Sequence, residues 1–223
     1  MEIEENYIKM KVSHKGGELT FQYPAFKGTY GNVAEQIDKD GLKRPNSPKT
    51  ASLVYGAWKN SEGEKESEII KILINNWLWE FTGNLYLPKS NEEINNGVIL
   101  EYNPKITNGK LIMDKNSLVQ RLKKNDSSVN FVPFGYKIDS QNLFEFQKNS
   151  YIVARYGKEG AEKIAEVASK YKSNPYIRSF KSVDEETARM SALGSNWDFG
   201  GRLFVFGDGW VDGDQCHAFG VKK

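Results

Sequence analysis

The chain of 223 residues carries 31 lysine and arginine side chains against 29 aspartates and glutamates, a formal net charge of +2. Proteins dominated by nucleic-acid binding are usually markedly basic, so this charge disfavours that class while leaving room for a local basic region. Twelve phenylalanines, 11 tyrosines and 5 tryptophans can build a sizeable core, which excludes a disordered chain.

Three features of the chain bear on its cellular location. Its only cysteine, Cys216, cannot form a disulfide within the chain, which fits a reducing compartment. The first ten residues are acidic and lack the apolar stretch of a secretory signal. The most apolar run, IIKILINNWLW over 69–79, contains Lys71 and is too short to cross a bilayer. We therefore expect a cytoplasmic protein that makes no membrane contact.

The first predicted element is a β-hairpin over residues 7–23. Apolar side chains alternate with polar ones on both sides of Gly16-Gly17, as in two antiparallel strands that bury one face. Residues 31–41 follow as a short helix, which Gly41 would end.

Two further helices are predicted before residue 80. The first has Ser47 as its N-cap and Pro48 in its first turn, where the amide hydrogen that proline lacks would have no partner. The second starts near Glu66, because apolar residues then recur at helical spacing. Its predicted buried stripe consists of Ile70, Leu73, Ile74, Trp77 and Leu78.

The middle of the chain is rich in predicted strands. They cover 84–88, 97–104, 109–114, 129–138 and 142–147. The second and third of them are expected to pair as a hairpin through the segment KITNG. Pro133 cannot donate to a strand ladder, so the fourth strand should lie at a sheet edge or contain a bulge. A short basic helix is predicted over 115–126.

The last third of the chain begins with a predicted strand, glycine turn and helix over 151–175. Ser182 followed three residues later by Glu185 has the spacing of a capping box, which predicts the start of another helix. A strand over 202–206 then precedes the final loop and a last short strand.

These elements together predict an α+β protein, with about five helices packed against a mixed but mainly antiparallel sheet. Hairpins outnumber strand–helix–strand units, and hairpins pair their strands antiparallel. No fixed-period repeat and no low-complexity tract divides the chain. We expect a single domain over 1–223, with the polar stretch 88–97 as its one weak subdivision.

The segment GDGWVDGDQCHAFG, residues 207–220, is the best candidate for a functional site. It holds three aspartates, four glycines, the only cysteine and one of the two histidines. Together with the residues just before 207, this segment combines aromatic rings with charged groups, as ligand-binding surfaces do. We expect a ligand or a protein partner to bind a C-terminal surface made of Trp197, Asp198, Arg202, Asp208, Trp210 and His217. The competing interpretation is that these rings only close the end of the core.

Three other kinds of site are disfavoured in 207–220. A glycine-rich phosphate turn needs a helix after it, and only ten residues remain after Gly213. Structural zinc needs four ligands, mostly cysteine and histidine, and the chain has one cysteine and two histidines. A nucleophilic Cys216 would have to use His14 as its base, because the adjacent His217 would point to the opposite face of a strand.

A divalent cation is the strongest alternative for this segment. Asp208, Asp212 and Asp214 supply oxygen ligands within seven residues, and the glycines would let the backbone fold around Ca²⁺ or Mg²⁺. The spacing does not match an EF-hand loop. Asp-Gly pairs are also common turn signals, so a plain loop without a cofactor is the favoured interpretation. With a cation bound, the same aspartates would suit a cation-dependent hydrolase.

A second alternative is a single-stranded nucleic-acid-binding module that uses residues 170–181. This segment, KYKSNPYIRSFK, interleaves basic with aromatic side chains, as surfaces that stack bases do. Across 155–181 there are seven lysines and arginines against three glutamates, so the small net charge conceals a basic region. Such runs are more often solvated helix faces, and nucleic acid is therefore not the favoured partner.

Overall fold

The computed structural model describes residues 8–196, 201–209 and 216–222. Among these residues the helices are α1 (Tyr30–Lys39), α2 (Ser47–Lys59), α3 (Glu64–Asn75), α4 (Lys115–Lys123), α5 (Leu143–Lys148) and α6 (Ser150–Ala168). The first strands are β1 (Ile8–His14), β2 (Gly17–Tyr23), β3 (Phe26–Lys27), β4 (Trp77–Leu87), β5 (Gly97–Tyr102), β6 (Lys105–Thr107) and β7 (Lys110–Ile112). The later strands are β8 (Val129–Pro133), β9 (Asp139–Ser140), β10 (Tyr176–Arg178), β11 (Thr187–Asn196), β12 (Arg202–Gly209) and β13 (His217–Ala218).

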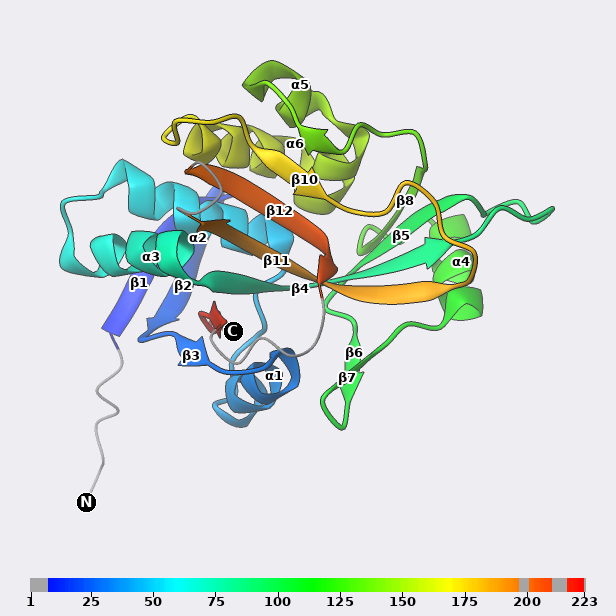
Figure 1. Ribbon diagram of the computed structural model, residues 1–223. Helices are drawn as coiled ribbons and strands as arrows, with labels where there is room; N and C mark the ends of the chain where they lie inside the picture. The colour runs from blue at the N-terminus through cyan, green and yellow to red at the C-terminus, as the bar shows by residue number, and fades with distance from the viewer. Residues whose placement is uncertain (1–7, 197–200, 210–215, 223) are drawn as a thin grey trace.

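The main sheet joins strands from both halves of the chain (Figure 1). Its path runs β3-β13-β4-β11-β12-β10-β9, and β5 and β8 extend it from the far half of β4. Most pairs are antiparallel, while β10 with β12 and β13 with β4 are parallel. The structure thus confirms the predicted α+β class with a mixed, mainly antiparallel sheet. The polar stretch 88–96 connects β4 to β5, which pair with each other.

The two faces of this sheet belong to two separate cores. Leu78, Leu193 and Val205 face the larger core, which α2, α3 and α6 cover (Figure 1). Their chain neighbours Trp79 and Ala192 face a smaller core, which α1 covers only in part. This alternation follows from the period of two along a strand. A third cluster, under α4, packs against β5 and β8.

The hairpin β1–β2, helix α1 and helix α4 confirm their local sequence signals. Lys15 and Gly16 both have positive φ, as a two-residue hairpin turn requires. Gly41 follows α1 with φ 68°. Pro48 lies in the first turn of α2, but the N-cap is Asn46 rather than Ser47, because the Asn46 side chain accepts from the amide of Lys49. Pro133 lies on β8, an edge strand that pairs with β5.

Two predictions before residue 115 are wrong in detail. The helix predicted through Leu78 ends at Asn75, and Trp77 begins β4, because pairing with β11 overrides the apparent helical period. The hairpin predicted between 97–104 and 109–114 does not form. Instead β5 pairs with β4 and β8, and β6 pairs with β7 across a turn at Asn108-Gly109.

Three predictions after residue 140 are also wrong. The strand predicted over 142–147 is instead helix α5, Leu143–Lys148, since Asn142 caps the amide of Glu145. Residues 151–156 are helical and form the first part of α6, which breaks at Gly157 with φ 71°. The capping-box spacing at 182–185 starts no helix, and β11 follows it directly. At 151–156 and 182–185, tertiary packing outweighs a short local pattern.

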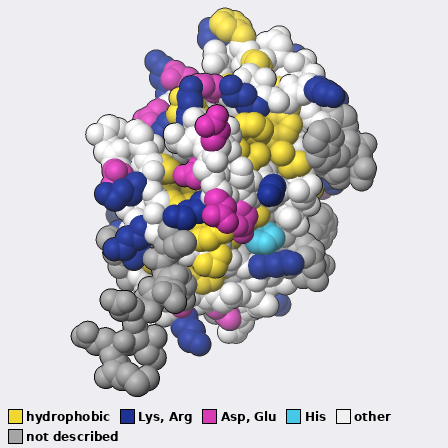
Figure 2. All heavy atoms as spheres, turned by 90° about the vertical axis from the view of Figure 1, so that its left-hand side faces the viewer, with side chains coloured by type: hydrophobic (Ala, Val, Ile, Leu, Met, Phe, Trp, Pro, Cys, Tyr) yellow, Lys and Arg dark blue, Asp and Glu magenta, His cyan; other side chains and the backbone are white. Residues whose placement is uncertain are grey.

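The surface mixes charges of both signs. Figure 2 shows the side of the molecule where α3 and the β1–β2 hairpin lie, with basic and acidic side chains interspersed and apolar side chains between them. In the part of the chain that the structure describes, no helix is long and apolar enough to cross a membrane.

Candidate ligand-binding surface

A cavity of about 240 Å³ opens on the face of the sheet that α1 leaves partly uncovered. It lies over β4, β11 and β12, with β10 at one side and the start of β13 at the other. Apolar and aromatic side chains form most of its wall, and one cation and one anion complete it. The lining residues are Trp77, Trp79, Arg178, Ala192, Phe206, Asp208, Gly209 and Cys216.

Strand periodicity explains why these side chains meet. On β12, Phe204, Phe206 and Asp208 are two residues apart and therefore point to the same face. The neighbouring β10 runs parallel to β12, with Tyr176 opposite Phe204 and Arg178 opposite Phe206. The register thus places an aromatic pair and a cation–aromatic pair side by side on one surface.

Four rings form a continuous row across this surface, which we call the aromatic row: Trp77, Phe206, Phe204 and Tyr176. The ring centroids of Trp77 and Phe206 are 3.9 Å apart at an interplanar angle of 67°, an edge-to-face contact. Phe206 and Phe204 are 5.6 Å apart, and Phe204 and Tyr176 are 5.4 Å apart. Trp77, Phe204 and Tyr176 are half-buried, so part of each side chain is exposed to solvent.

Charged groups border the aromatic row. Arg178 Nε donates to Asp208 Oδ2 at 2.9 Å, and its guanidinium lies 5.7 Å from the centroid of Phe206. The Arg178 side chain is 59% exposed and that of Asp208 is 16% exposed. At the other end of the row, the guanidinium of Arg202 lies 5.9 Å from the ring of Tyr176. Two described carboxylates also lie at this surface: Asp208 pairs with Arg178, and Asp139 accepts from the Tyr176 hydroxyl at 2.8 Å.

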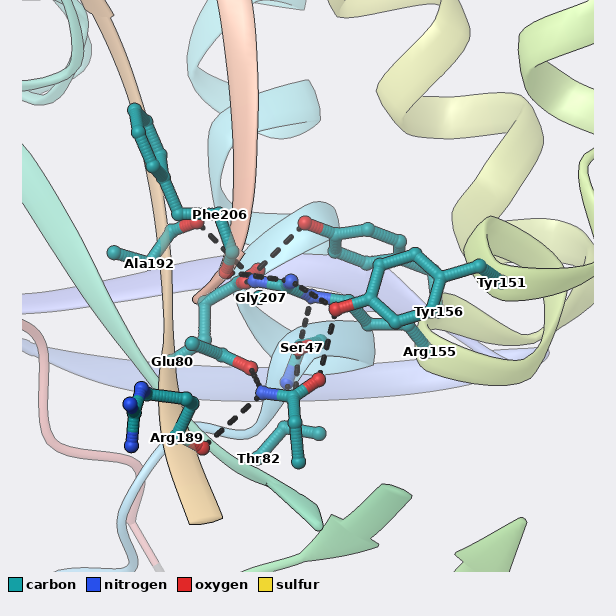
Figure 3. Close-up of polar contacts among 12 residues, drawn as sticks. Ser47, Glu80, Thr82, Tyr151, Arg155, Tyr156, Arg189, Ala192, Phe206 and Gly207 are labelled. Carbon is teal, nitrogen blue, oxygen red and sulfur yellow. Dashed lines mark hydrogen bonds and ion pairs between the residues drawn. The ribbon is translucent and has the colours of Figure 1, made fainter. Parts of the chain in front are cut away.

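A buried ionic cluster holds the strands behind this surface in place (Figure 3). Arg155, fully buried on α6, pairs with the equally buried Glu80 of β4. It also donates to the carbonyl oxygens of Phe206, at 2.7 Å, and Ala192, at 3.1 Å. Burial works against the charge on Arg155, but the adjacent Glu80 carboxylate outweighs it and raises the pKa of Arg155 well above its usual value.

Tyrosine hydroxyls extend this cluster. Tyr156 donates to Glu80 at 3.2 Å, and Tyr151 donates to Asn84 at 2.8 Å. Tyr86 donates to the carbonyl oxygen of Gly207, the residue after Phe206, at 3.0 Å. Two of the residues that line the cavity, Ala192 and Phe206, are thus fixed through their main chain by one arginine. The surface has a rigid base.

The structure describes three of the residues predicted for the C-terminal surface. Arg202 and Asp208 lie on β12 and face the aromatic row from opposite ends. His217 lies on β13, where it is half-buried and pairs in register with Leu78 and Lys27. Trp197, Asp198 and Trp210, as well as Asp212 and Asp214, lie outside the described residues.

The structure also disfavours a nucleophilic Cys216 with His14 as its base. Cys216 is 5% exposed and lines the cavity beside the aromatic row. His14 lies at the end of β1, lines a different cavity and forms a hydrogen bond with Ser52. The two side chains therefore belong to separate parts of the molecule.

Sequence reasoning missed most of the residues on this surface. Trp77 and Trp79 were assigned to a helical stripe and an apolar run, and Arg178 and Tyr176 to a basic segment. A period of two was present, since Tyr176 and Arg178, like Phe204 and Phe206, are two residues apart. The sequence patterns did not indicate that β10 pairs with β12 or that β4 pairs with β11, and these pairings bring the side chains together.

The proposed cation ligands are only partly described. Among the residues that the structure covers, no three histidines, cysteines, aspartates or glutamates come together as a metal site would require. Asp208 forms its ion pair with Arg178. A Ca²⁺ or Mg²⁺ site that uses Asp212 and Asp214 stays a prediction.

The aromatic side chains of 170–181 do not share one surface. Tyr171 packs edge-on against Trp58 of α2, and Phe180 packs edge-on against Tyr86 of β4. Tyr176 alone joins the aromatic row. A stacking platform for successive bases would need these rings in one exposed series, so the geometry gives this alternative little support.

Comparisons with known proteins identify the fold but no family. No family model and no curated protein matches the chain. One solved structure is similar to this chain. Its description reads "Accommodation of massive sequence variation in Nanoarchaeota by the C-type lectin fold", and the likeness covers 99% of this chain and 100% of that chain. The TM-score is 0.59 and the sequence identity is 14%. At this identity the likeness concerns the fold alone: the chain has an α+β architecture of the C-type lectin kind.

Proposed function

We propose that the chain is a binding domain that holds its ligand or partner on the aromatic row and in the adjacent cavity. The observation that carries this proposal is the half-exposed series Trp77, Phe204 and Tyr176, next to the exposed guanidinium of Arg178. Large aromatic side chains are usually covered by another element. Here α1 covers only part of the face, and a partly open aromatic surface of this kind is typical of recognition sites.

The lining suggests which chemical groups would fit. The apolar cavity would accept a flat or ring-shaped group against Trp77 and Phe206. Arg178 could then hold an acidic or other hydrogen-bond-accepting group at the rim. The cavity, at about 240 Å³, is smaller than the sites that enclose a whole drug-sized ligand. This size favours a ring or side chain that projects from a larger partner.

The structural neighbour is compatible with this proposal. It is described as a C-type lectin fold that accommodates massive sequence variation. A fold that tolerates variation suits a recognition surface, since different side chains on one scaffold would select different ligands.

The proposal is tested on an array of immobilised glycans and peptides, followed by titration of the ligands that bind. Phe204→Ala and Arg178→Ala each remove one element of the surface. We expect each variant to weaken binding at least about tenfold, because aromatic and arginine side chains dominate recognition energetics.

Phe144→Ala is the matched control, since Phe144 is 63% exposed on α5 and lies outside the aromatic row. Urea denaturation of all three variants verifies that they fold. Ligands that bind Phe204→Ala and Arg178→Ala as tightly as the wild type would place recognition elsewhere and refute the proposal.

A further inference from the structure

Three polar side chains from separate elements meet away from the aromatic row. They are His14 at the end of β1, Ser52 in α2 and Lys163 in α6. His14 Nδ1 lies 2.9 Å from Ser52 Oγ, and Lys163 Nζ lies 3.0 Å from the same oxygen. The β1–β2 hairpin packs against α2, which in turn packs against α6 (Figure 1). The fold therefore brings a hydroxyl, an imidazole and an ammonium group into direct contact.

The donors and acceptors in this cluster allow a hydrogen bond from Ser52 to His14. Lys163 has three protons, and its ammonium contacts the carbonyl oxygen of Ser13 at 3.0 Å, Ser52 Oγ at 3.0 Å and Glu159 Oε1 at 2.6 Å. An ammonium can only donate, so Ser52 Oγ accepts from it. In the His14 tautomer that leaves Nδ1 unprotonated, the Ser52 hydroxyl donates its proton to that nitrogen.

The charges around His14 favour this neutral form. Burial is the main cause that lowers the pKa of His14, followed by the nearby cations Lys15 and Lys163. Glu159 acts in the opposite direction, and Lys49 adds to the lowering. At neutral pH the imidazole is therefore an acceptor beside a hydroxyl, which is the arrangement of a general base and its nucleophile.

A small cavity opens beside this pair. It measures about 70 Å³, and His14 and Ser52 line it together with residues 157–160. Gly157, with φ 71°, interrupts α6, so residues 158–160 begin a second helical segment. The first amides of a helical segment have no acceptor within it. Main-chain amides at such a position are the donors that stabilise an oxyanion in acyl-transfer enzymes.

We propose that Ser52 is an acyl-accepting nucleophile with His14 as its general base, and that this site hydrolyses esters of short carboxylic acids. Ser52 Oγ would attack the ester carbonyl carbon while its proton passes to His14 Nδ1. The bond from that carbon to the leaving alkoxy group then breaks, and His14 returns the proton to the departing oxygen. Water attacks the acyl-serine in the same manner, which releases the acid and restores the hydroxyl.

The size of the cavity defines the substrate class. A space of about 70 Å³ has room for an acetyl-sized acyl group and not for a long chain. Lys163 is a positioning residue, because it orients the Ser52 hydroxyl and contacts the nucleophile rather than the scissile bond. This activity is independent of the binding surface proposed above, since the two cavities share no residue.

The experiment uses the full chain and p-nitrophenyl acetate. We expect release of p-nitrophenol and an acetyl group that peptide mapping by mass spectrometry places on Ser52. Ser52→Ala should abolish both, and His14→Gln should lower the acylation rate at least about a hundredfold. Ser169→Ala is the control, because Ser169 is an exposed serine at the end of α6 and should react like the wild type.

A pH profile separates a base from a merely structural histidine. The rate should rise with pH through the lowered pKa of His14 and level off above it. Lys15→Asn removes a cation that lowers this pKa, so it should move the inflection to higher pH without contacting Ser52. No acetylation of wild-type Ser52, or acetyl groups found only on lysines and the amino terminus, would overturn the proposal. Because that mapping uses the wild-type protein, the result does not depend on the folding of any variant.

Discussion

Arg155→Met should be among the most destabilising single substitutions in this chain. Glu80 is fully buried, and its Oε1 has no hydrogen-bond partner among the described residues. Without Arg155 the buried carboxylate would keep only the Tyr156 hydroxyl. Removing one partner of a buried ion pair typically costs about 3–5 kcal/mol. The carbonyl oxygens of Ala192 and Phe206 would lose a charged donor as well.

The assay is urea denaturation followed by tryptophan fluorescence. A loss of about 4 kcal/mol corresponds to a fall of roughly 1–2 M in the urea midpoint for a protein of this size. Lys11→Met is the control, because the Lys11–Glu18 pair on the β1–β2 hairpin is largely exposed and should contribute at most about 1 kcal/mol.

A double variant tests the reason for the loss. Arg155→Met with Glu80→Met removes both charges, so it should recover about 1–3 kcal/mol relative to the sum of the two single losses. The reasoning fails if Arg155→Met is no less stable than Lys11→Met. It also fails if the two single losses simply add.

Three further predictions follow from the cores, the thiol and the final loop. Leu73→Ala should lower the free energy of unfolding by about 2–5 kcal/mol, because Leu73 of α3 is fully buried in the larger core. An unchanged urea midpoint would contradict its place in the core. Cys216, at 5% exposure, should react slowly with a thiol reagent in the native protein and rapidly after unfolding; fast native labelling would show that the cavity wall is open. Millimolar Ca²⁺ or Mg²⁺ should leave the melting temperature unchanged if 207–220 is only a loop. A rise that Asp212→Asn abolishes and Asp184→Asn preserves would establish a cation site and favour the hydrolase.

Local sequence patterns predicted the elements in which the apolar pattern and the turn or cap residues indicate the same structure. The β1–β2 hairpin combines strict alternation with a glycine turn, and α1 ends at a glycine that adopts positive φ. The strand predicted over 202–206 also forms, as the first part of β12. In these places no distant partner was needed to choose between helix and strand.

The missed elements depended on distant partners. Residues 151–156 have the aromatic and branched composition of a strand, yet they are helical because Tyr151, Arg155 and Tyr156 reach the sheet from one side. Arg155 and Glu80 are 75 residues apart, and nothing in a single sequence marks them as a pair. The same holds for Trp77 and Phe206, which meet only because β11 lies between their strands.

The anchoring of β11 and β12 has a consequence for how this chain can change. Arg155 and Tyr86 bind main-chain oxygens of Ala192, Phe206 and Gly207, and every amino acid supplies such an oxygen. The side chains that make these hydrogen bonds lie in α6 and β4. The outward-facing side chains of β10 and β12 can therefore be exchanged without breaking those bonds. A library randomised at Tyr176 and Phe204 would sample new specificities at a small cost in folded protein. If the proposed surface binds a ligand, its specificity can thus change without loss of the contacts that hold the fold.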